Sequence, residues 1–87
     1  MTQYKIAVKN SLRHKLDKKN NKENREKLCM ALDISDSTID RWLSLNDPNT
    51  PKTEDLPILC KVLRITLYEL FNISISSDLT EALLNYN

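Results

Sequence analysis

Five polar side chains with directional hydrogen-bonding chemistry stand close together near the middle of this 87-residue chain. They are Asp36, Ser37, Asp40, Arg41 and Ser44. The guanidinium of Arg41 is a planar donor that can form two parallel hydrogen bonds, whereas a hydroxyl both donates and accepts and a carboxylate only accepts. All five are predicted to point outward from one short helix, because the apolar Ile39 and Leu43 recur four residues apart and turn toward the core.

Two short helices joined by a tight turn are predicted to position these side chains. The first helix runs roughly from Arg25 to Leu32 and the second roughly from Asp36 to Ser44, with Asp33-Ile34-Ser35 as the turn. Leu28, Cys29 and Leu32 share one face of the first helix. Two amphipathic helices that cross steeply at a short turn form the helix-turn-helix unit.

This stretch resembles the helix-turn-helix of the phage repressor and Cro-like family, also called the xenobiotic-response-element family. The matching residues are Leu28-Cys29, Leu32-Asp33-Ile34-Ser35, Thr38-Ile39 and Arg41-Trp42. Further matches downstream extend the resemblance over roughly Val8 to Phe71. The resemblance implies an all-α fold, a compact bundle of about five short helices with a central helix-turn-helix, as in lambda-repressor-like DNA-binding domains.

Two residues depart from the family pattern. Cys29 stands where the family has a small Ala, a modest change because a free thiol behaves as a small hydrophobe. Asp33 stands where the family has the Gly of the turn. If that position needs a left-handed backbone, Asp tolerates it better than most residues do, though less well than Gly.

The resemblance implies that the helix at about 36–44 enters the major groove of DNA, which admits an α-helix. Asp36, Ser37, Asp40, Arg41 and Ser44 are then the candidate base contacts. Arg41 could donate to O6 and N7 of one guanine, and Ser37 and Ser44 could bond to base edges or phosphates.

Asp36 and Asp40 are unexpected on such a surface, because carboxylates repel phosphates. We consider three interpretations: the two carboxylates accept a hydrogen bond from cytosine N4, they orient Arg41, or this face no longer binds DNA.

Positive charge is concentrated in the N-terminal third. The first 27 residues hold nine Lys or Arg and three Asp or Glu, a net charge of +6, whereas residues 28–87 hold four and nine, a net charge of −5. A basic segment beside a helix-turn-helix is typical of contact with a polyanion. The candidate phosphate contacts are Lys18, Lys19, Lys22 and Arg25; the alternative is a solvated, Lys-rich helix face.

Further helices are predicted on both sides of the motif. One spans about Lys9 to Lys19, with residues 1–8 left open between helix, strand and arm. Asn24 and Ser35 are the expected caps of the motif helices, and Thr53 and Thr66 those of the next two. A last helix, residues 79–86, begins after Asp78. We therefore divide the chain into a helix-turn-helix DNA-binding domain, 1–77, and a helical tail, 78–87, with a possible role in dimer contact.

Several classes of function have no signal in the sequence. Cys29 and Cys60 are expected to be reduced core thiols, His14 is the only histidine, and no Cys/His spacing resembles a zinc site. The chain has no glycine, which argues against a phosphate-cradling loop. We expect no enzyme activity, metal, cofactor, small-molecule ligand or membrane contact, and a cytoplasmic location.

The sequence therefore predicts a sequence-specific DNA-binding transcriptional regulator that works as a homodimer on double-stranded DNA. The alternative is a protein-interaction module that keeps the helix-turn-helix fold without binding DNA. The operator, the regulated genes and the direction of regulation do not follow from the sequence.

Overall fold

The computed structural model describes residues 2–72 of the chain. In that part the elements are α1 (Gln3–Leu16), α2 (Lys22–Leu32), α3 (Asp36–Leu43), a 3-10 turn (Thr53–Asp55), α4 (Leu56–Leu63) and α5 (Leu67–Leu70). The all-α prediction, with about five short helices around a helix-turn-helix, is confirmed for these residues.

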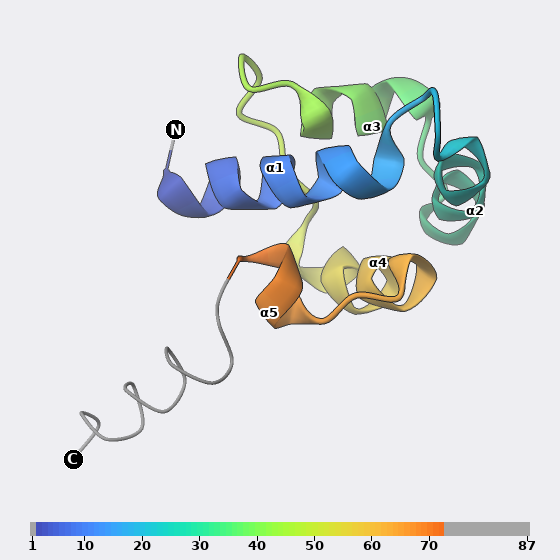
Figure 1. The fold of residues 1–87 in the computed structure, drawn as a ribbon. Helices are drawn as coiled ribbons and strands as arrows, with labels where there is room; N and C mark the ends of the chain where they lie inside the picture. The colour runs from blue at the N-terminus through green and yellow to red at the C-terminus, as the bar shows by residue number, and fades with distance from the viewer. Residues whose placement is uncertain (1, 73–87) are drawn as a thin grey trace.

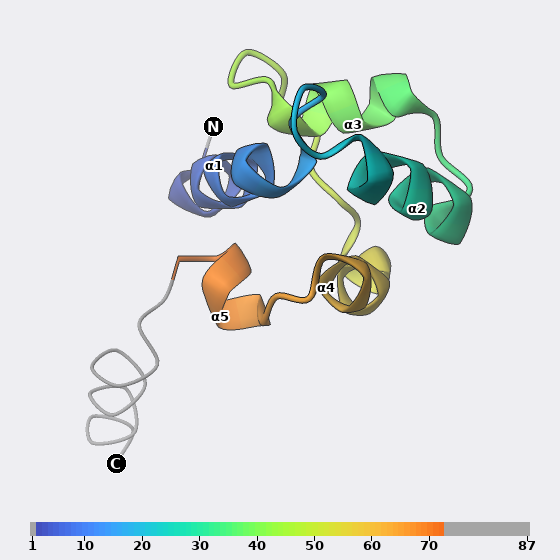
Figure 2. The ribbon, with the colours of Figure 1, turned by 45° about the vertical axis from the view of Figure 1, so that its right-hand side comes forward.

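Helix α1 runs through the middle of the arrangement, with α3 on one side and α4 and α5 on the other (Figure 1). A view turned by 45° keeps this order and shows α2 and α3 meeting at the turn (Figure 2). The core lies between these helices and contains Val8, Leu12, Leu16, Leu28, Ile39, Trp42, Leu59, Leu63, Ile65 and Leu70. Trp42, 4% exposed, belongs to this core.

The first helix starts earlier than predicted. It begins at Gln3 and not near Lys9, because the Thr2 hydroxyl caps it by accepting from the Lys5 amide. It ends at Leu16, because Asp17 turns away and its carboxylate accepts from the Asn20 amide at 3.1 Å. The open question about residues 1–8 is thus answered from Gln3 onward: they are helical.

Helix α2 also begins earlier, at Lys22, so the prediction that Asn24 caps it is wrong. Asn21 occupies the cap position, and its side chain donates to the carboxylate of Asp17. Asn24 lies inside the helix, where its side-chain amide donates to the backbone carbonyl of Lys15 at 3.2 Å. The polar linker is therefore a hydrogen-bonded turn that fixes α2 against the end of α1.

The turn between α2 and α3 does need a left-handed residue at the position where the family has Gly. Asp33 adopts the left-handed conformation, φ 52° and ψ 50°. The Ser35 hydroxyl caps α3 by accepting from the Thr38 amide at 3.3 Å. Helix α3 is one residue shorter than expected, since Ser44 is its C-terminal cap.

The last two helices follow the prediction only in part. Thr53 is not a cap but the first residue of a 3-10 turn, and Pro57 lies in the first turn of α4. Thr66 caps α5 in a reciprocal capping box with Glu69. The spacing of Leu67, Leu70 and Phe71 predicts that all three face inward. Leu70 is buried, but Leu67 is 48% exposed, so the prediction is wrong for Leu67. The expected tail helix, 79–86, and the boundary at residue 77 lie outside the described residues.

Candidate nucleic-acid interface

Helix α3 is amphipathic, and its polar side faces away from the protein. Ile39 is fully buried, whereas Asp36, Ser37, Asp40 and Arg41 are exposed. Ser44, at the C-terminal cap, is half-buried. Among the described residues, no ion pair or side-chain hydrogen bond engages the Arg41 guanidinium. Four of the five candidate base contacts are therefore exposed to solvent, and the fifth is partly so.

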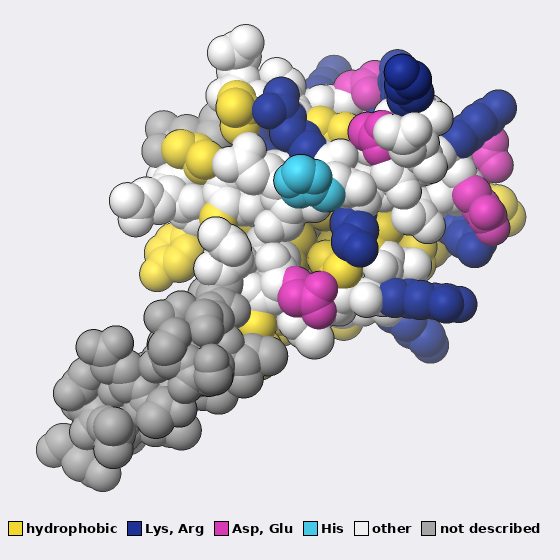
Figure 3. Space-filling model, viewed as in Figure 1, with side chains coloured by type: hydrophobic (Ala, Val, Ile, Leu, Met, Phe, Trp, Pro, Cys, Tyr) yellow, Lys and Arg dark blue, Asp and Glu magenta, His cyan; other side chains and the backbone are white. Residues whose placement is uncertain are grey.

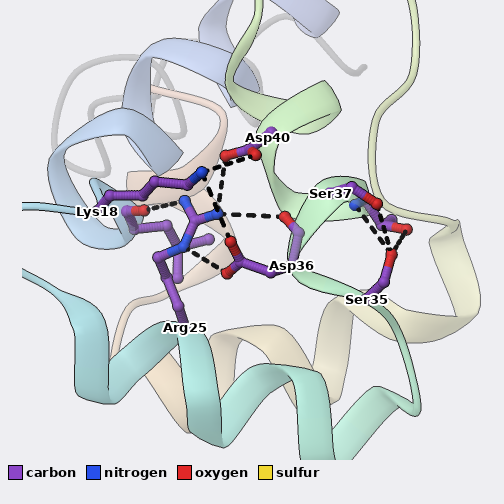
Figure 4. A network of polar contacts seen from close by, with 8 residues as sticks. Lys18, Arg25, Ser35, Asp36, Ser37 and Asp40 are labelled. Carbon is purple, nitrogen blue, oxygen red and sulfur yellow. Dashed lines mark hydrogen bonds and ion pairs between the residues drawn. The ribbon is translucent and has the colours of Figure 1, made fainter.

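The two carboxylates of α3 belong to a four-residue network with Arg25 and Lys18 (Figure 4). The buried Arg25 donates through Nε to Oδ1 of Asp36 and through Nη2 to Oδ1 of Asp40, each at 2.8 Å. Lys18 Nζ lies 3.1 Å from Oδ2 of Asp40 and 3.8 Å from Oδ2 of Asp36. Each carboxylate oxygen thus has one cationic neighbour, and the network is neutral overall.

Arg25 also joins the backbones of two helices. Its Nη1 donates to the Leu16 carbonyl at 2.8 Å and its Nη2 to the Asp36 carbonyl at 3.2 Å. The side chain is 3% exposed. The sequence predicts an accessible phosphate contact at Arg25. The structure instead buries it between α1, α2 and α3, where bonds to protein acceptors compensate its desolvated charge.

The network lowers the pKa of both carboxyl groups. The Arg25 hydrogen bond is the main reason that the pKa of Asp36 lies below its ordinary value of 3.8. For Asp40, desolvation raises the pKa, but hydrogen bonds from Arg25 and Lys18 outweigh it and leave the pKa lowered. Both residues are therefore anionic acceptors at neutral pH. The interpretation that they orient Arg41 is wrong, because their partners are Arg25 and Lys18.

The other predicted phosphate contacts lie at the start of the motif. Lys18 and Lys19 are exposed in the turn after α1, and Lys22 is exposed at the start of α2. An open groove beside them is lined by Lys18, Lys22, Arg25, Glu26, Cys29, Met30 and Asp36. Lys and Arg side chains, with acidic groups among them, gather at the right-hand end of the molecule, where α2 and α4 lie (Figure 3). Lys18 is shared between this exposed region and the carboxylate network.

Two cations of α1 hold the other end of α3, and our sequence interpretation missed both roles. The fully buried Lys9 donates to the carbonyls of Arg41 at 2.8 Å, Trp42 at 3.2 Å and Asn49 at 2.6 Å. Arg13 Nε donates to the Leu43 carbonyl at 3.0 Å. The sequence position of the two residues could have indicated these roles. Lys9 directly follows the apolar Val8, and Arg13 lies one turn later on the same side of α1.

The remaining candidates for chemistry are unremarkable in the described part of the chain. Cys29 and Cys60 are free and half-buried, and desolvation raises the pKa of both thiols, which disfavours the reactive thiolate. No group of His, Cys, Asp and Glu residues suited to a metal ion occurs among residues 2–72. Of the helices described, none has the length and apolar character needed to cross a membrane.

Comparison with known proteins gives one match. A family model described as a Cro/C1-type HTH DNA-binding domain matches residues 11–74. This range contains the motif helices α2 and α3, with Arg25 on α2, and the two helices that follow. No curated protein and no solved structure matches the chain.

Proposed function

The chain belongs to the Cro/C1-type helix-turn-helix DNA-binding family, and from this premise we propose that it is a sequence-specific transcriptional regulator that binds DNA with α3 in the major groove. The family match supports a DNA-binding regulator in general. The observation that carries the specific proposal is the free, exposed Arg41 on the outer side of a helix whose inner side is fixed in the core.

We assign base reading to the exposed side of α3. Arg41 supplies the paired donors that match O6 and N7 of guanine, and Asp36 and Asp40 supply acceptors. Ser37 stands at the N-terminal end of the same surface and Ser44 at the C-terminal end. Helix α3, at eight residues, is about 12 Å long, a length that the major groove accommodates.

Phosphate contacts fall to Lys19 and Lys22, with Lys18 contributing when it leaves the carboxylates. These exposed cations flank the start of α2 and lie outside the core. Phosphate contacts position a protein on DNA, whereas base contacts specify the sequence. Arg25 acts in this proposal as a structural residue, because its donors already bond to protein acceptors.

We further propose that the regulator works as a homodimer, with residues 1–77 as the DNA-binding domain and residues 78–87 as the dimer contact. A two-fold protein matches the two half-sites that helix-turn-helix dimers bind. Leu79, Leu83 and Tyr86 recur along the tail sequence at helical spacing, which favours an apolar stripe.

A protein-interaction module is the second candidate, and the exposed carboxylates of Asp36 and Asp40 are the observation in its favour. Their charge is balanced by Arg25 and Lys18, however, so the surface of α3 is not strongly repulsive to DNA.

The decisive experiment is selection of bound sites from a random duplex pool with the full chain, followed by salt titration of binding to random DNA. The proposal predicts an enriched, two-fold related site and a steep loss of affinity with salt, because phosphate contacts release counterions. No enrichment and no salt-dependent DNA binding would reject the proposal in favour of the interaction module.

A further inference from the structure

We propose that Asp36 and Asp40 read bases that carry an exocyclic amino group, cytosine or adenine, and that Arg25 is the residue that positions both carboxylates for this reading. The inference rests on the proposed function, since it concerns the same surface of α3. It adds the class of base that the operator presents to these two residues. It also makes Arg25 contribute to sequence specificity, because Arg25 positions the groups that read bases, whereas a phosphate contact would contribute to affinity on any sequence.

Arg25 holds one oxygen of each carboxylate in a fixed place. The two charge-assisted bonds to the Oδ1 atoms measure 2.8 Å, and the guanidinium is almost completely buried. A buried cation that lost these partners would keep only carbonyl acceptors and no anionic partner, so the bonds persist when a ligand approaches. Arg25 therefore acts as a clamp on the acceptors.

Lys18 covers the opposite oxygens in a replaceable way. Its side chain is 65% exposed, and its distances to the two Oδ2 atoms are 3.1 and 3.8 Å. Exposed ion pairs of this kind contribute little to stability. A DNA phosphate is an alternative anionic partner for the Lys18 ammonium. When the Lys18 ammonium moves to a phosphate, one oxygen of each carboxylate becomes free to accept a new hydrogen bond.

The chemistry of the groove selects the partner of those oxygens. An ionised carboxylate only accepts hydrogen bonds. On the base edges of the major groove, the donors are the amino groups N4 of cytosine and N6 of adenine, whereas guanine and thymine present acceptors there. A guanine or thymine opposite the carboxylate would place acceptor against acceptor. The preferred bases are therefore cytosine and adenine.

The spacing of the two residues suits the reading of two positions that are two base-pair steps apart. Asp36 and Asp40 are four residues apart and lie on the same side of α3. Their separation along the helix axis is about 6 Å, close to two base-pair steps of about 3.4 Å each. Arg41, next to Asp40, adds a donor to this pair of acceptors. One short helix thus presents hydrogen-bond acceptors to some base pairs and a hydrogen-bond donor to another.

The test removes single amino groups from the selected DNA site. Each cytosine is replaced in turn by 2-pyrimidinone and each adenine by purine, and affinity is measured for the full chain. We expect wild-type protein to lose at least about fivefold at one or two positions per half-site. Asp36→Ala or Asp40→Ala should abolish the loss at its own position. Glu23→Ala, which removes an exposed carboxylate of α2 whose ion pair is with Lys27, should keep every loss.

Arg25→Lys tests the clamp, because it keeps the charge but cannot donate to both carboxylates as a guanidinium does. We expect it to reduce the penalty for the missing amino groups while thermal unfolding shows a folded protein. If Arg25→Lys does not fold, the two Asp variants still decide the proposal. Equal penalties in wild type and both Asp variants at every position would overturn it, and so would the absence of any penalty. Failure to bind any DNA would instead reject the proposed function.

Discussion

The ammonium of Lys9 donates a 2.8 Å hydrogen bond to the backbone carbonyl of Arg41, a residue of α3 whose side chain is exposed. The same ammonium bonds to the carbonyls of Trp42 and Asn49. A cation at the C-terminal end of a helix also interacts favourably with the helix dipole. Helix α1 thereby fixes the end of α3 from which Arg41 projects.

Replacing Lys9 by Met should destabilise the fold. The change leaves carbonyl oxygens in a buried region without their donor, which costs about 1–3 kcal/mol of unfolding free energy. Denaturant unfolding measures the loss. Lys15→Met, at an exposed position of the same helix, is the control and should change the free energy of unfolding by less than about 0.5 kcal/mol. Equal effects of both substitutions would show that the buried contacts of Lys9 contribute nothing special.

Arg41→Ala should weaken binding to the selected site by about 1–3 kcal/mol and relax the preference at one base pair per half-site. Its effect on random DNA should be far smaller, because a base contact is lost and not a phosphate contact. Binding curves on both DNAs at one salt concentration make the comparison. Equal losses on the two DNAs would reassign Arg41 to the DNA backbone, and no loss on either would favour the interaction module.

Lys22→Ala should weaken binding by a similar factor on all DNA sequences and reduce the slope of log affinity against log salt by about one. Lys22 is exposed at the start of α2 and is not buried in the core. Lys61→Ala, at an exposed position of α4, is the matched control and should leave the slope unchanged. A slope that is the same for wild type and Lys22→Ala would remove Lys22 from the phosphate contacts.

Acid should destabilise the protein through the carboxylates of α3. The pKa values of Asp36 and Asp40 are lowered in the folded state, so the folded protein binds fewer protons than the unfolded chain in that range. Their stabilisation is therefore complete above about pH 3.8 and is lost as the pH falls through the folded-state pKa values.

Thermal unfolding measured between about pH 5 and pH 2 tests this dependence. Asp36→Asn should lower the unfolding temperature at the higher pH and make the acid-induced decrease shallower. Asp33→Asn serves as control, because Asn tolerates the left-handed turn and the Asp33 carboxylate has no part in the network. A decrease as steep in Asp36→Asn as in wild type would argue against this titration as its source.

Deleting residues 78–87 should leave a folded domain that sediments as a monomer and binds the selected site more weakly. The reasoning is that a two-fold site gains affinity from two linked half-site contacts. Sedimentation of the full and shortened chains without DNA provides the measurement. If the full chain is already monomeric at binding concentrations, the tail is not a dimer contact in the free protein.

The sequence was sufficient for the helix-turn-helix because several local signals agree there. Asp33 takes the left-handed conformation, Ser35 caps α3, and Ile39 is buried as its spacing indicates. The start of α2 was misplaced because Asn21 and Asn24 are both good caps, and the contacts of Asp17 and Lys15 decide between them.

Sequence patterns could not predict which groups the long basic side chains contact. Arg25 was expected on the surface, but its hydrogen bonds run to the Leu16 carbonyl and to carboxylates 11 and 15 residues away. Lys9 reaches carbonyls more than 30 residues away. Helical periodicity shows which face a residue occupies, but the acceptors under that face depend on how the helices cross.

The left-handed residues have a further consequence for how the protein could evolve. Asp33, Arg64 and Asn72 take positive φ values of 52–57° in a chain without glycine. For a residue such as Arg64, with a long side chain, this conformation stores about 1–2 kcal/mol of local strain. Arg64 closes α4, on the far side of the core from the outward face of α3. Glycine at this single position would release the strain and stabilise the fold. The greater conformational freedom of the unfolded chain would offset part of that gain. The stability of the domain could therefore increase through Arg64 without any change to the exposed residues of α3, because the two sites lie on different helices.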